Sequence, residues 1–373
     1  MSEIYLVFVV FLFVLAVFDL MVGVSNDAVN FLNSAIGAKV AKFRTIIIVA
    51  AVGVFMGATM SNGMMEVARN GVFHPAMFSL KELMFIFLAV IISDVILLDI
   101  FNNLGLPTST TVSLVFELLG GTTAFVLLKL ANDTTGLTVG DLMNTEKALG
   151  MIMAIFVSVA IAFFFGIVLQ YISRLVFTFT YKKNLKWKIG IFGGVATTAI
   201  FYFMLFKGIK SMSFVTPEIY EYIQNHTLAI LGICFLASTA IMQFLYFLKV
   251  NVFKILVLMG TFALAMAFAG NDLVNFIGVP LAGYSAYTDF AASGASDPST
   301  FMMSSLEGPA KSPMIFLVAA GAVMVFSLAT SKKAHNVIKT SVDLSRQSEG
   351  DEMFGSSKIA RVLVRFSNNT PNF

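Results

Sequence analysis

The sequence predicts an all-α polytopic membrane protein, built as an inverted-topology repeat with broken helices or helical hairpins. Three observations lead to this fold class: 58% of the 373 residues are hydrophobic, only 12% are charged, and one short polar motif occurs twice. Soluble domains carry about 25% charged residues, so most of the apolar surface of this chain must face lipid. The small net charge of +3 gives no indication of nucleic-acid binding.

About nine or ten membrane segments are expected. Each apolar run reaches or approaches the roughly 18 to 20 residues that cross a hydrocarbon core about 30 Å thick. The first run has no positively charged flank before it, so we interpret it as a membrane span and not as a signal peptide. In chain order the runs are residues 4–24, 45–60, 83–101, 108–130, 149–177, 189–206, 228–248, 252–269 and 313–330.

Basic residues predict the orientation of these segments in a cell or inner membrane. They cluster in loops that alternate crossings place on one side, which the positive-inside rule makes the cytoplasm. The N-terminus is then outside and the C-terminal tail is cytoplasmic. The clusters are Lys39, Lys42 and Arg44; Lys182, Lys183, Lys186 and Lys188; Lys249 and Lys254; and Lys332 and Lys333.

The repeated motif predicts an internal duplication. Residues 25–31 read Ser-Asn-Asp-Ala-Val-Asn-Phe, and residues 270–276, which lie 245 positions later, read Gly-Asn-Asp-Leu-Val-Asn-Phe. The predicted topology orients the two copies in opposite directions. Antiparallel copies that are interrupted near the middle of the bilayer are typical of secondary transporters with inverted repeats.

Three regions follow from this duplication. Residues 1–179 form the first transmembrane repeat, with its signature at 25–37 and a hairpin at 102–129. Residues 180–331 form a second and incomplete repeat, with its signature at 270–283. Residues 332–373 are expected to be a polar cytoplasmic linker or tail.

Seven carboxylates lie inside or at the margin of the apolar runs: Asp19, Asp27, Glu66, Asp94, Asp99, Glu117 and Asp272. A carboxylate at the bilayer centre costs about 2.5 to 3.5 kcal/mol, so bound cations, protons or internal water are the expected partners. We interpret Asp19, Asp99 and Glu117 as interfacial or protonated packing residues. The repeated Asn-Asp context marks Asp27 and Asp272 as cation ligands, and their hard oxygen donors suit Na⁺.

Residues 104–111 predict an anion site. Gly105 and Pro107 interrupt the helix, and Ser109, Thr110 and Thr111 then occupy the first turn of the next one. Free backbone N–H groups, the helix dipole and hydroxyl donors together bind anions. The alternative is ordinary N-capping and helix packing through small residues.

Glu66 and Arg69 lie three residues apart on one predicted helix face. They form either an intrahelical ion pair or a place where Glu66 meets a transported cation. An enzyme is not expected, because the three histidines lie in loops or the tail and no nucleophile with a base or metal triad is apparent.

Taken together, these motifs resemble the inorganic phosphate transporter family called PiT. Residues 26–30 and 271–275 are similar to its duplicated G-A-N-D-V-A-N-A signature, residues 107–112 to its P-x-S-T-T-H motif, and residues 66–71 to its E-T-I-R-x-G stretch. The resemblance implies a symporter that carries inorganic phosphate with Na⁺, or less readily H⁺, by alternating access, with no other cofactor.

The same resemblance implies a set of site residues. Phosphate would lie between the two repeats, and Asp27, Asp272 and Glu66 would serve Na⁺ coupling. The residues expected to bind the substrate are Asn26, Asp27, Asn30, Ser109, Thr110, Thr111, Asn271, Asp272 and Asn275.

Two departures from the family pattern stand out. Val112 replaces the histidine that follows the Thr-Thr pair, and no second P-x-S-T-T motif follows the second Asn-Asp copy. We therefore expect the chain to lack a C-terminal part of the same protein, and the sequence leaves a homodimer open. The alternative functions are a transporter of another oxyanion, such as sulfate or arsenate, and a cation channel.

Overall fold

The computed structural model describes residues 2–61, 66–132, 136–178, 185–208, 216–308 and 312–344. Every apolar run that the sequence analysis identified forms a helix in this part of the chain. These helices are α1 (Ser2–Gly37), α2 (Phe43–Met60), α4 (Leu80–Leu104), α5 (Thr110–Ala131), α7 (Thr145–Phe177), α8 (Lys188–Gly208), α10 (Thr227–Phe247), α11 (Val252–Ser293) and α12 (Met314–Thr330).

Length and hydropathy confirm the polytopic all-helical fold class. Within the described ranges, seven helices are long and apolar enough to cross a membrane. An eighth span results if α12 and α13 (Lys332–Leu344), whose axes differ by 67°, are counted as one bent segment. The connections carry further short helices that the sequence analysis did not predict: α3 (Glu66–Asn70), η1 (Pro75–Met77), α6 (Val139–Leu142), α9 (Pro217–Asn225) and η4 (Ser304–Glu307).

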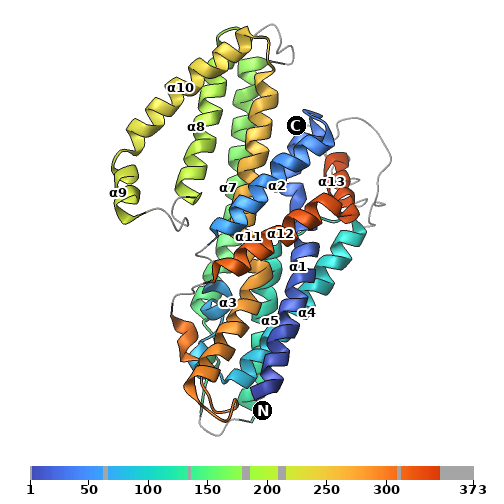
Figure 1. Cartoon of the computed structure of the whole chain (residues 1–373), viewed down its shortest axis with the longest axis vertical. Helices are drawn as coiled ribbons and strands as arrows, with labels where there is room; N and C mark the ends of the chain where they lie inside the picture. Colours follow the sequence, from blue (N-terminus) through green and yellow to red (C-terminus); the bar gives the residue numbers. More distant parts are fainter. Residues whose placement is uncertain are drawn as a thin grey trace, which may run out of the picture.

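Helix α1 lies at the centre of the core, in contact with α4, α11, α12 and α13 (Figure 1). It runs parallel to α4, since Phe8 contacts Phe85 near one end and Asn26 bonds to Asn102 near the other. It runs antiparallel to α11, because Phe13 contacts Tyr284 whereas the later Phe31 contacts the earlier Phe268. The predicted antiparallel arrangement of the two motif copies is therefore found.

The contacts between the two copies are reciprocal. The Phe276 ring lies so close to Gly23 that a Cβ atom there would be 2.0 Å from it, and Phe31 packs on Phe268. Because the motif copies lie 245 positions apart, Gly23 is equivalent to Phe268 and Phe31 is equivalent to Phe276. Each contact is therefore the counterpart of the other. Likewise, α1 contacts α12 while α11 contacts α2. Such exchange is the geometry expected of inverted repeats.

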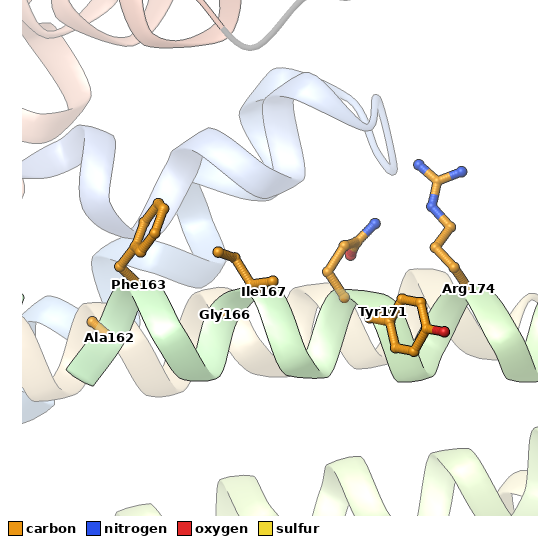
Figure 2. Close-up of a pocket in the computed structure, with 7 residues that line it drawn as sticks. Ala162, Phe163, Gly166, Ile167, Tyr171 and Arg174 are labelled. Atoms are coloured by element: carbon orange, nitrogen blue, oxygen red, sulfur yellow. The ribbon is translucent and has the colours of Figure 1, made fainter. Parts of the chain in front are cut away.

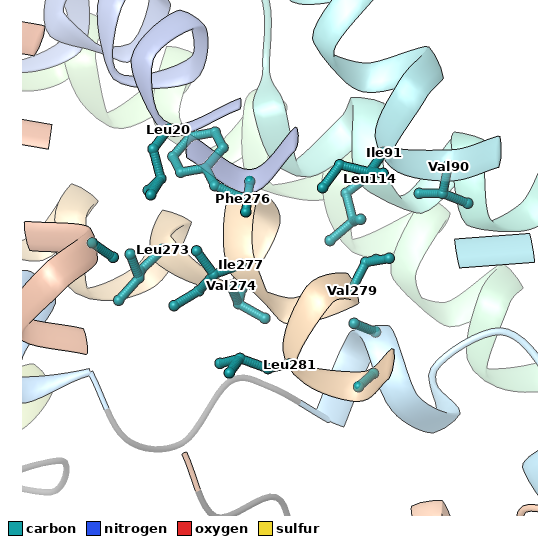
Figure 3. Close-up of a cluster of buried hydrophobic side chains, with 14 of the residues drawn as sticks. Leu20, Val90, Ile91, Leu114, Leu273, Val274, Phe276, Ile277, Val279 and Leu281 are labelled. Carbon is teal, nitrogen blue, oxygen red and sulfur yellow. The ribbon is translucent and has the colours of Figure 1, made fainter. Parts of the chain in front are cut away.

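Apolar side chains fill the space between these helices. Leu20 of α1, Ile91 of α4 and Leu114 of α5 gather around Phe276 and Ile277 of α11 (Figure 3). All five are less than 5% exposed. This packing fixes the motif copies against each other and leaves their polar side chains little freedom to move.

The predicted interruption of the two motif helices is wrong. Helices α1 and α11 run unbroken through both Asn-Asp copies, and α11 even contains Pro280. The breaks lie elsewhere, at the connection of residues 105–109 and at Ser331 between α12 and α13. Four polar side chains of the motif copies find partners on α4 or α5 while the helix backbone stays closed: Asn26, Asp27, Asp272 and Asn275.

The expected polar linker also differs in its first part. Residues 332–344 form α13, which packs on α1 and α4 and buries Ala334, Val337 and Ile338. Asn33 of α1 donates to Ser341, and Lys333 pairs with Asp99 of α4. The rest of the predicted tail, residues 345–373, lies outside the described residues.

Helices α7, α8 and α10 extend away from this core (Figure 1). None of the most apolar window of α7 is buried, as expected for a lipid-facing helix. A shallow pocket of about 580 Å³ lies along this helix and is lined by α7 residues from Ala162 to Arg174 (Figure 2). Among the described residues α7 alone lines this pocket, so they provide no opposite wall to enclose a ligand.

Candidate functional site

The connection between α4 and α5 positions the candidate site. Helix α4 ends at Gly105, whose φ of 68° is the left-handed conformation that glycine adopts without strain. Residues 105–109 then lead directly into α5, with Ser109 as its N-cap and its hydroxyl accepting from Val112 N at 3.3 Å. The predicted helix break is therefore present, but residues 110–131 form one helix, so the hairpin consists of α4 and α5 and not of the predicted residues 102–129.

Asn26 of the first motif copy holds this connection in place. Its Nδ2 donates to Asn102 Oδ1 at 2.8 Å and to the Leu106 carbonyl at 3.1 Å, while its Oδ1 accepts from Thr108 N at 2.8 Å. Asn102 in turn donates to the Val22 carbonyl at 2.7 Å. Since Asn26 is fully buried and its amide is occupied at both ends, it positions α5 and does not present a free group to a ligand.

The two predicted carboxylates meet at the first turn of α5. Thr110 Oγ1 donates to Asp27 Oδ2 at 3.3 Å, and Thr111 Oγ1 donates to Asp272 Oδ1 at 3.4 Å. Both aspartates are more than nine-tenths buried, and electrostatic repulsion acts between them. These two hydrogen bonds join residues that lie 83 and 161 positions apart in the sequence, and they bring all four residues into one polar cluster.

Asn275 of the second copy links the two halves of this cluster. Its Nδ2 donates to Thr110 Oγ1 at 3.1 Å, to Thr111 Oγ1 at 3.0 Å and to Asp272 Oδ1 at 3.4 Å. The side chains of Asp27, Thr110, Thr111, Asp272 and Asn275 therefore form a continuous network, which we call the central network.

Three other predicted residues lie beside this network with exposed side chains. They are Asn30, Ser109 and Asn271. Asn30 is one turn beyond Asp27 on α1, which places the two on the same helix face. Asn271 precedes Asp272 and occupies the position equivalent to Asn26, yet it is exposed where Asn26 is buried.

Glu66 begins α3, but its side chain lies outside the described part of the chain. Its predicted pairing with Arg69, or with a cation, stays a prediction. Arg69 itself is buried, and its Nη2 donates to the Ser305 carbonyl at 3.1 Å. Arg69 thereby ties α3 to η4.

Sequence reasoning missed two polar residues that organise the site. Asn102 supports Asn26, and Ser61 Oγ donates to the Gly270 carbonyl at 2.6 Å, next to the second motif copy. Both lie at the end of an apolar run, directly before a glycine-containing segment. That position was the available signal, but terminal polar residues are common and do not by themselves indicate a partner.

Comparisons with known proteins bear on the family and the fold. The model of the family described as "Phosphate transporter family" matches residues 23–341. A solved structure described as "The sodium-dependent phosphate transporter" superposes with a TM-score of 0.65 at 18% identity, over 92% of this chain and 79% of the other. At that identity the likeness establishes the fold. A search of curated proteins found no match.

Proposed function

Because the chain belongs to the phosphate transporter family, we propose that it is a symporter that carries inorganic phosphate across the membrane with Na⁺. The observation that supports this most directly is the central network, in which two carboxylates from antiparallel helices meet the first turn of α5. Hydroxyl, amide and helix N-terminal N–H groups suit the phosphate oxygens, while the carboxylates suit a cation.

Electrostatics requires the cation in this mechanism. Asp27 and Asp272 already repel each other, and a phosphate dianion placed beside them would add to the repulsion. One or two Na⁺ ions bound to these carboxylates would neutralise both the aspartates and part of the phosphate charge. Phosphate then binds well only when Na⁺ is present, which is the thermodynamic basis of coupled transport.

Access from either side would alternate by movement of the two repeats about this site. We assign α1 and α2 to the first repeat (1–179) and α11 and α12 to the second (180–331), and the reciprocal contacts around Gly23 and Phe31 support that division. In the proposed orientation the N-terminus is outside and the tail is cytoplasmic, as the basic loops indicate.

Phosphate is favoured over sulfate by a simple difference in hydrogen bonding. HPO₄²⁻ carries a proton at neutral pH and sulfate does not, so a carboxylate or amide oxygen at the site would be paired by phosphate and left unpaired by sulfate. Unlabelled sulfate should therefore compete poorly with labelled phosphate uptake. Arsenate, which is protonated like phosphate, should compete well.

Uptake into proteoliposomes with an imposed Na⁺ gradient tests the proposal. Asp27→Asn and Asp272→Asn should each abolish Na⁺-driven phosphate uptake while the protein still folds and inserts. Asp99→Asn is the matched control, because Asp99 pairs with Lys333 away from the central network, and it should transport normally. Na⁺-dependent uptake that survives in either aspartate variant would refute the assignment, and single-channel currents without phosphate would favour a cation channel.

A further inference from the structure

Three carboxyl groups that the proposed mechanism does not use lie together in the helical core. Asp19 of α1 and Asp94 of α4 are 0% and 1% exposed, and Glu117 of α5 is partly buried. All six of their carboxyl oxygens are buried; the Asp19 and Asp94 carboxyls lie within hydrogen-bonding reach of each other, and the six oxygens have no other hydrogen-bond partner among the described residues. We call these three residues the acidic triad.

The acidic triad adjoins the central network. Asp19 interacts electrostatically with Asp94, with Glu117 and with Asp27, and Asp94 also interacts with Asp27 and Glu117. Helix α4 packs against α1, to which it is parallel, and against α5, to which it is antiparallel, and this packing brings the three side chains together. Through Asp27 the triad is in electrostatic contact with the site proposed for Na⁺ and phosphate.

Among the described residues, no ion pair neutralises the triad. Lys129 is bound to Glu82 and to the Met77 carbonyl, and Lys333 is paired with Asp99. In the same part of the chain, the charged groups that interact with the triad are Asp27 of α1 and, beyond it, Asp272 of α11. All of these are acidic, so ionisation of several triad members at once would be strongly unfavourable.

Protonation is a direct way to remove the charge of a buried carboxyl group. A proton needs only a single carboxyl oxygen, and a carboxylic acid can donate to a neighbouring carboxylate. Buried acids in membrane helices commonly serve as proton relays.

We propose that Asp19, Asp94 and Glu117 form a proton-binding site that exchanges protons with water and is linked to phosphate binding. In the binding step an O–H bond of a hydronium ion breaks, an O–H bond to a triad carboxylate forms and water is left; in the release step the carboxyl O–H bond breaks and water takes up the proton as hydronium. This inference rests on the proposed function for its link to phosphate. The protonated triad places no charge beside Asp27 and so favours the phosphate-loaded site, and rising pH should weaken phosphate binding.

Infrared difference spectroscopy of the purified protein in Na⁺ tests this proposal. A step in pH should change the carbonyl stretching band of protonated carboxylic acid, and addition of inorganic phosphate should increase that band. Asp94→Asn and Asp19→Asn should each remove most of the response. Glu117→Gln keeps the test valid if the two aspartate variants do not fold, because its partly buried side chain is the easiest of the three to replace without unfolding the protein.

Asp99→Asn is the control, since this carboxylate lies on the same helix as Asp94 but is already paired with Lys333. Its spectrum should match that of the unmodified protein. A pH-insensitive band, or a pH-dependent band that persists in all three triad variants, would overturn the proposal. Radiolabelled phosphate binding measured in parallel separates the two ideas, since absent binding refutes the proposed transport function while the pH response still decides the proton site.

Discussion

Asn26 provides the sharpest test of how the site is built, because its replacement by alanine removes three hydrogen bonds at once. The lost partners are Asn102 Oδ1, the Leu106 carbonyl and Thr108 N. Hydrogen bonds contribute about 0.5 to 1.5 kcal/mol each and average about 0.6 kcal/mol between membrane helices. Asn26→Ala should therefore lower the free energy of unfolding by about 2 to 4 kcal/mol.

Unfolding of the detergent-solubilised protein, followed by helix content during denaturant titration, measures this change. Asn103→Ala is the matched control: Asn103 is exposed and bonds only locally to Asp99 on the same helix, so its loss should stay within about 0.5 kcal/mol. A double-mutant cycle with Asn102→Ala should show coupling, since both variants remove the same bond. The reasoning fails if Asn26→Ala and Asn103→Ala destabilise the protein equally.

The same unfolding assay tests three further changes. Gly57→Ala would place a Cβ 2.0 Å from the Met266 carbonyl oxygen, so it should cost about 1 to 3 kcal/mol by forcing α2 from α11; unchanged stability would contradict this close packing. The Cβ of Gly120→Ala meets no atom within 4 Å, so this change should stabilise α5 by about 0.5 to 1 kcal/mol. A loss of stability would contradict the open space around Gly120. Lys333→Met breaks a half-exposed pair with Asp99 and should cost less than about 1 kcal/mol, so a larger loss would mean that the pair anchors α13.

The sequence predicted those features that depend on local composition or on counting. Each apolar run became a helix because hydropathy over about 20 residues decides membrane insertion. The antiparallel orientation of the two motif copies followed from the parity of crossings between them, which requires no knowledge of packing, whereas the meeting of Asp27 with Asp272 was implied by the family resemblance. These inferences needed only the order of the segments along the chain.

Features that depend on distant partners could not be predicted in the same way. An Asn-Asp pair in an apolar run suggests a helix break, yet α1 stays intact because Asn26 finds Asn102 at a distance of 76 residues in sequence. Residues 332–344 read as polar, although Ala334, Val337 and Ile338 recur at helical spacing and are buried against α1 and α4. The charged residues of this segment drew attention away from the helical spacing of its apolar residues.

The two motif copies have the same sequence pattern but contact different parts of the α4–α5 hairpin. The first copy uses Asn26 to hold the entry into α5, whereas the equivalent residue of the second copy, Asn271, is exposed. The second copy instead uses Asn275 to bind Thr110 and Thr111, while its equivalent, Asn30, is exposed. Under the pseudo-twofold relation, Asn30 and Asn271 are the two positions that a second hairpin like α4–α5 would engage. The α4–α5 hairpin is thus held by one asparagine from each copy, Asn26 and Asn275, which occupy non-equivalent positions in the motif.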